Sequence, residues 1–142
     1  MFQMIARLFT ALINSTALRY GTFPTAADGV AAVAITIPAA AVAWTFGAWT
    51  QIVAAAGVTV EQQIVGFTLE NFVGALSQGE VEIGSGAGGA EAALGRFQST
   101  AGQYLLPSPI RVPAATRLAA RYRTATGVAD TVDVKLIVLT GF

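Results

Sequence analysis

The chain contains neither cysteine nor histidine among its 142 residues. It can therefore form no disulfide and no thiolate nucleophile, and it lacks the usual ligands of zinc sites. The missing imidazole also removes the side chain that serves most often as a general base near neutral pH. We therefore expect a protein that is not an enzyme and that carries no cofactor or metal.

Charge is scarce as well. Eight basic and eight acidic residues make up 11% of the sequence, whereas about 25% is usual in soluble domains. A monomer of this size exposes on the order of 6,900 Å², and so few charges leave large apolar patches on that surface. We expect other copies of the chain or other proteins to cover them. Because the charges sum to zero, neither nucleic acid nor a membrane is favoured as a partner.

Residues 23–142 read as short strands separated by Gly, Pro and Ala turns, with no strong helical pattern between them. The candidate strands are residues 30–37, 43–54, 63–73, 79–83, 93–99, 109–112, 116–124 and 131–139. This spacing predicts an all-β fold, an antiparallel β-sandwich of the jelly-roll type. The last strand is the clearest, because Val132, Val134, Leu136 and Val138 alternate with residues of the opposite face.

Residues 1–22 are predicted to form a separate N-terminal helix or arm. Large apolar residues recur at helical spacing and indicate an amphipathic helix of about three turns. They are Met1, Ile5, Leu8, Phe9, Leu12 and Ile13. The helix either closes one end of its own domain or docks on a neighbouring subunit, so we take Ile5, Leu8, Phe9 and Leu12 as candidate interface residues. With one basic residue, Arg7, it is poorly suited to a membrane surface.

The few charges are segregated along the chain. Residues 61–91 contain five glutamates and no basic residue, whereas residues 96–123 contain five arginines and no acid. Opposite blocks of this kind meet either within a fold or across a symmetric interface. Arg117, Arg121 and Arg123 share one strand face and are further candidate interface residues. Three interpretations stay open for them: a solvated face, pairing with glutamates of another subunit, and binding of an anion or glycan.

Two motifs have a structural explanation that we favour over a functional one. The run from Gly84 to Gly89 fits G-x-G-x-x-G, but no acid follows between residues 92 and 129 to bind a ribose. Its glycines are better explained by positive φ angles or close packing. Trp44 and Phe46 share a strand face while Trp49 points to the other, which predicts core filling on two sides instead of a sugar-stacking platform.

Residues 30–49 are long and uncharged enough to suggest a membrane span. Pro38 lies in the middle of this stretch, and Val33, Ile35 and Ile37 alternate with smaller residues in the period of a strand. We therefore interpret it as buried strands.

Three segments resemble small β-sandwich virion proteins of tailed bacteriophages. They are residues 81–91 (VEIGSGAGGAE), 106–121 (LPSPIRVPAATRLAAR) and 131–136 (TVDVKL). The resemblance extends over residues 30–140 and implies a structural role on the particle, as a capsid decoration, a head fibre or spike, or a tail-associated module. It implies no catalytic residues.

The sequence therefore predicts a non-enzymatic structural protein of a phage virion, which decorates or cements the capsid. We expect a homo-oligomer, a trimer by analogy with jelly-roll virion proteins, with other virion proteins such as the major capsid protein as partners. The alternative is a receptor- or glycan-binding module of a head or tail fibre. An exposed patch of aromatic and polar residues would favour that alternative.

Overall fold

A computed structural model describes residues 19–24, 34–74, 79–98, 100–126 and 130–141. The predicted N-terminal helix, with Ile5, Leu8, Phe9 and Leu12, lies outside the described residues. Within them, no helix is long and apolar enough to cross a membrane.

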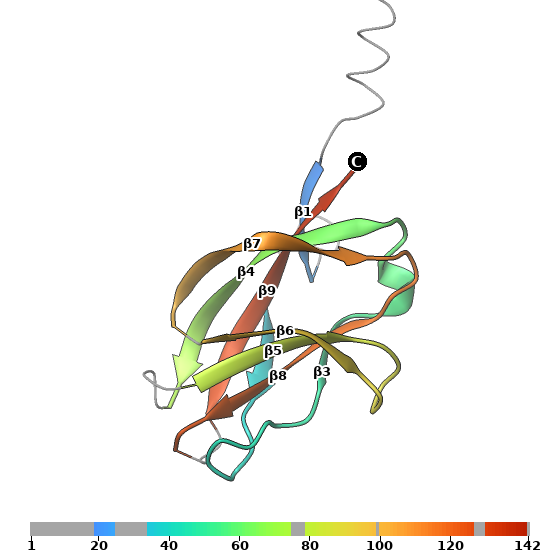
Figure 1. The fold of residues 1–142 in the computed structure, drawn as a ribbon. Helices are drawn as coiled ribbons and strands as arrows, with labels where there is room; N and C mark the ends of the chain where they lie inside the picture. Colours follow the sequence, from blue (N-terminus) through green and yellow to red (C-terminus); the bar gives the residue numbers. More distant parts are fainter. Residues whose placement is uncertain (1–18, 25–33, 75–78, 99, 127–129, 142) are drawn as a thin grey trace, which may run out of the picture.

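The described residues are mostly antiparallel β-strands arranged in two sheets (Figure 1), as expected for an all-β sandwich. The elements are β1 (Arg19–Phe23), β2 (Ile35–Pro38), β3 (Thr50–Val53), the short 3-10 helix η1 (Ala55–Gly57), β4 (Gln62–Val73), β5 (Gly79–Ser85), β6 (Ala92–Gln98), β7 (Gly102–Val112), β8 (Leu118–Thr124) and β9 (Thr131–Thr140). One sheet has the order β1-β9-β4-β7, with β2 also pairing with β9, and the other has the order β3-β8-β5-β6.

The core lies between the sheets and follows the period of two in the sequence. In β9, Val132, Val134, Leu136 and Val138 are all buried, and the residues between them are partly exposed. Burying one face of each strand sets its register, because a shift by one residue would turn every apolar side chain outward. The predicted alternation of the last strand is thus confirmed.

Three segments differ from the sequence-based expectation. Residues 43–49 are not a strand, and β3 begins only at Thr50. β7 is longer than predicted, because Pro107 and Pro109 are accommodated where its pairing with β4 jumps from Ile110 to Leu105. Proline is tolerated there since β7 is an edge strand. β1 was not predicted, and it places residues 19–22 of the expected arm in the sheet beside β9.

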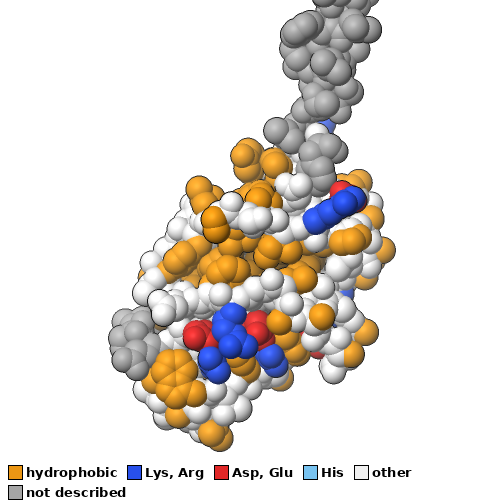
Figure 2. All heavy atoms as spheres, in the orientation of Figure 1, with side chains coloured by type: hydrophobic (Ala, Val, Ile, Leu, Met, Phe, Trp, Pro, Cys, Tyr) orange, Lys and Arg blue, Asp and Glu red, His pale blue; other side chains and the backbone are white. Residues whose placement is uncertain are grey.

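The two open edges of the sandwich differ. Near β2 the sheets are joined by a bridge between Ala39 and Tyr122. At the edges formed by β6 and β7, side chains that pack against the core are only partly buried; they include Leu94, Phe97, Tyr104, Leu106 and Ile110. Figure 2 shows hydrophobic atoms gathered in a band between these two edges. This β6–β7 seam is therefore an apolar surface of the single chain.

Ala115 lies in a left-handed turn with a φ of 58°, and its N–H donates to the carbonyl of Val58 at 2.8 Å. This conformation costs a non-glycine residue about 1–2 kcal/mol. Ala115→Gly should remove that cost and so stabilise the fold. Part of this gain is lost because glycine also gives the unfolded chain more conformational freedom. We expect the free energy of unfolding to rise by about 0.5–1 kcal/mol, measured by urea denaturation. Ala114→Gly, at a neighbour without a positive φ, should instead destabilise; equal effects would contradict the explanation.

Candidate functional site

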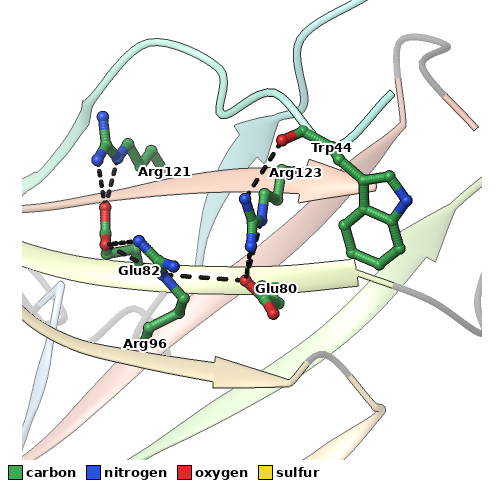
Figure 3. Close-up of polar contacts among 6 residues, drawn as sticks. All are labelled: Trp44, Glu80, Glu82, Arg96, Arg121 and Arg123. Atoms are coloured by element: carbon green, nitrogen blue, oxygen red, sulfur yellow. Dashed lines mark hydrogen bonds and ion pairs between the residues drawn. The ribbon is translucent and has the colours of Figure 1, made fainter. Parts of the chain in front are cut away.

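The most densely charged part of the molecule lies on the outer face of the β3-β8-β5-β6 sheet (Figure 3). At its centre the carboxylate of Glu82 is only 3% exposed. Its Oε1 accepts hydrogen bonds from Nε and Nη2 of Arg96 at 3.2 and 2.9 Å. Its Oε2 accepts from Nε of Arg121 at 2.6 Å. A buried carboxylate thus has both oxygens paired with guanidinium groups.

Glu80 makes a second set of contacts, two residues along the same strand. Its Oε2 accepts from Nε and Nη2 of Arg123 at 2.9 and 2.5 Å. The same oxygen lies 3.9 Å from Nε of Arg96. Arg96 therefore lies between the two carboxylates and links them into one network, as the dashed contacts in Figure 3 show.

Strand register produces this network. β5 pairs with β8 so that Glu82 lies opposite Arg121 and Glu80 lies opposite Arg123, and β6 places Arg96 opposite Glu82. Because successive side chains of a strand point to opposite faces, the alternate acids and arginines all face the same side. Opposite charges that face each other across strands stabilise the pairing.

Aromatic rings from residues 44–49 cover the guanidinium groups. The carbon Cζ of Arg121 lies 4.6 Å from the ring centre of Phe46 and 4.4 Å from that of Trp49. Cζ of Arg123 lies 4.7 Å from Phe46 and 5.6 Å from Trp44. These distances fit cation–π contacts. Rings and arginines thus alternate, and we call this set, together with Arg96, Glu80 and Glu82, the arginine ladder.

The backbone of this aromatic segment is fastened to β8. The N–H of Trp44 donates to the carbonyl of Thr124 at 2.7 Å, and the N–H of Gly47 donates to the carbonyl of Tyr122 at 2.9 Å. A Cβ at Gly47 would lie 2.4 Å from the carbonyl oxygen of Pro38, so the close approach of the segment requires glycine. The aromatic rings are therefore held over the sheet by the main chain as well as by the arginines.

The prediction that Trp44, Phe46 and Trp49 fill the core on two sides is wrong. Trp44 is 47% exposed, and Phe46 and Trp49 are half-buried. All three cover arginines on the outer face of a sheet, because the segment does not continue as a strand and leaves the core to β2 and β3. A sequence signal was present: arginines at positions 121 and 123 need partners on one face, and the uncharged segment supplies aromatic rings.

The glycine run after β5 serves packing. A Cβ at Gly84 would come within 2.5 Å of the Trp49 ring, so glycine makes room for that ring. Gly86 and Gly89 have φ angles of 126° and 84°, which favour glycine. The run leads into strand β6, whereas a dinucleotide site needs a helix there. The structural explanation of these glycines is confirmed.

The segregated charge blocks meet within the chain. Arg117, which precedes β8, donates from Nη1 to Glu91 at 2.5 Å and from Nε to Gln51 at 2.9 Å. Together with the pairs made by Arg121 and Arg123, this is one of the two arrangements expected from the sequence. Further pairs join Arg111 to Glu61 and Lys135 to Glu70. Six of the seven basic residues in the described part of the chain thus form ion pairs.

This pairing limits what the site can do chemically. Arg96 and Arg121 stabilise the carboxylate form of Glu82 and make it a poor general acid or base, and Glu80 is hydrogen-bonded to Arg123. In the described residues no group of three potential ligands is placed to hold a metal ion. The site presents aromatic rings and hydrogen-bonding groups on a backbone held by main-chain hydrogen bonds. These features are typical of a binding surface.

Acid titration should report on the ladder. Burial would raise the pKa of Glu82, but hydrogen bonds and charge from Arg96 and Arg121 outweigh it and lower the pKa below its ordinary 4.5. The same balance lowers the pKa of Glu91 beside Arg117. A carboxylate whose pKa is lower in the folded state stabilises the fold above its unfolded value and loses that contribution in more acidic solution. We expect the free energy of unfolding to fall as the pH drops below 4.5.

Glu82→Gln tests this expectation. The variant should lose about 3 kcal/mol at pH 7, because two guanidinium groups lose a buried charged partner. Its free energy of unfolding should also vary less between neutral and acidic pH than that of the natural sequence. The matched control is Glu70→Gln at the more exposed pair with Lys135, where about 0.5 kcal/mol or less is expected at pH 7. A Glu82→Gln protein with unchanged stability at pH 7 would contradict the central role of this carboxylate.

No model of a protein family matches the chain. No curated protein matches it either.

Proposed function

We propose that the protein is a non-enzymatic structural component of a bacteriophage virion, a homo-oligomer that decorates or cements the capsid. Strand order is the observation that carries the structural role. Strands β2 to β9 form the sheets β2-β9-β4-β7 and β3-β8-β5-β6, and the chain repeatedly passes from one sheet to the other. We interpret this order as a jelly roll, with β1 added beside the end of β9. Jelly rolls are common in viral capsid proteins.

The distribution of charge supports assembly through apolar surfaces. Because six of the seven basic residues in the described part of the chain are paired within it, the described surfaces left for partners carry little net charge. The β6–β7 seam is one of them. Tyr20 in β1 and Leu105 in β7 are also exposed. Part of this surface suits contact with other copies and with the major capsid protein.

The resemblance of residues 30–140 to phage virion proteins supports the same proposal. It carries the assignment to a virion, whereas strand order and surface support the structural role. Trimeric assembly rests on analogy with jelly-roll virion proteins.

We expect the purified protein to be oligomeric at micromolar concentration, measured by light scattering coupled to size exclusion. Its mass should stay the same between low salt and 1 M NaCl, a concentration at which the screening length falls to about 3 Å, because apolar contacts hold the copies together. The variant Leu106→Glu in the β6–β7 seam should lower the measured mass of the oligomer without unfolding the domain. A monomer under all conditions would overturn the proposal, and dissociation by salt would show that charges hold the copies together.

The N-terminal arm provides a second test. The described residues of the β domain already form a core between the two sheets, and we propose that the six large apolar residues among positions 1–14 pack on another surface. Burying six such side chains would contribute on the order of 9–18 kcal/mol before ordering costs. Deleting residues 1–14 should leave a folded β domain, judged by circular dichroism, that no longer forms the oligomer or joins the particle. Loss of strand signal would show that the segment belongs to its own core, and normal assembly would exclude an anchoring role.

A further inference from the structure

The arginine ladder ends in an aromatic ring that faces solvent. The indole of Trp44 is 47% exposed, beside the carboxylate of Glu80 (Figure 3). Trp49, at the other end, is packed over Gly84 and is half-buried. Trp44 is thus the ring of the ladder that a ligand can reach most easily.

The backbone holds Trp44 in this position at a cost. Its φ is 57°, in the left-handed region that residues other than glycine, asparagine and aspartate rarely adopt. The N–H bond to Thr124 and a hydrogen bond from Nη1 of Arg123 to the Trp44 carbonyl at 3.3 Å keep it there. Strain of this kind concentrates at binding sites, where the surrounding structure maintains it. Here the strained backbone holds an indole at the surface, where burial of the ring does not compensate for the cost of the strain.

Free hydrogen-bonding groups lie on the same face of the sheet as the ring. All contacts that Glu80 makes to Arg123 and Arg96 use Oε2, and Oε1 accepts no hydrogen bond from the described residues. The side chain of Arg96 is 50% exposed and bonds through Nε and Nη2, which leaves Nη1 free to donate within the described part of the chain. The exposed Gln98 lies opposite Glu80 on β6 and adds an amide. An acceptor and two donors thus lie on the face that carries Trp44.

We infer that this face binds a neutral pyranose, which stacks its C–H face on Trp44 and exchanges hydrogen bonds with Glu80, Arg96 and Gln98. Binding sites of this kind combine apolar and aromatic surface with a few polar groups that orient the ligand. The inference does not depend on where the protein sits in a virion, and it gives the glycan-binding alternative a specific site.

The charge state of the ladder selects a neutral sugar over an acidic one. Recognition of a carboxylate or phosphate relies on a free guanidinium fork. Arg121 and Arg123 direct theirs at Glu82 and Glu80. An acidic sugar would also lie next to the Glu80 carboxylate. Nucleic acid is disfavoured for the same reason, since it requires a surplus of positive charge along its backbone.

The two tryptophans make the test direct. Trp49→Phe leaves Trp44 as the single indole, so its fluorescence reports on that ring alone. Titration with methyl glucoside, methyl galactoside and methyl N-acetylglucosaminide should change the emission for at least one of them. A dissociation constant on the order of 1–10 mM is expected for a single sugar unit. Saturation-transfer NMR on the natural sequence should show contact with the ring protons of the same sugar.

Trp44→Asn removes the ring while keeping a residue that tolerates the left-handed backbone. It should lose the NMR signal, and Gln98→Ala should weaken binding several-fold. Val42→Ala, at an exposed residue of the same loop, should bind as the natural sequence does. Circular dichroism checks that each variant is folded. No response to any of the three glycosides, equal binding by a folded Trp44→Asn protein, or tighter binding of glucuronic acid would each overturn the inference.

Discussion

A buried carboxylate that must stay charged governs one whole face of this protein. Removing Glu82 from water would cost several kcal/mol if it were unpaired, and Arg96 and Arg121 meet that requirement from the two strands that flank it. Slipping either strand by one residue would turn its arginine to the core and leave the carboxylate with one of its two partners. The pairing thus fixes the register of β6, β5 and β8 as firmly as the apolar core does.

The same interaction explains why residues 44–49 leave the core. Guanidinium groups bonded edge-on to carboxylates still expose flat faces, and aromatic rings cover those faces favourably. Phe46 lies between Arg121 and Arg123 and contacts both. Main-chain bonds to β8 and the glycines at positions 47 and 84 then allow the segment to approach. One buried acid therefore accounts for strand register, loop conformation and glycine placement together.

Sequence patterns predicted the parts of the fold that repeat and missed those that depend on distant partners. The period of two in residues 131–139 predicted β9, because alternation is a local signal. The segregated blocks of glutamate and arginine predicted that opposite charges meet. Neither signal shows that Arg123 lies against the rings of Trp44 and Phe46. Trp44 was therefore assigned to the core from the strand alternation expected for residues 44–49. Most of β7 was missed because of Pro107 and Pro109. Proline indicates the end of a strand unless the strand is known to lie at the edge of a sheet.

Scarce charge limits how this protein can attract partners. When most of the described glutamates and arginines neutralise one another inside a single chain, little charge remains there to guide partners by long-range attraction. Contacts with other molecules must then depend on shape, apolar area and directed hydrogen bonds. The β6–β7 seam supplies apolar area, which suits permanent contact between protein surfaces. The rim of the ladder instead supplies a rigid ring with unused donors and an acceptor. Because the ladder has already ordered these groups, a ligand there would lose little free energy to further ordering.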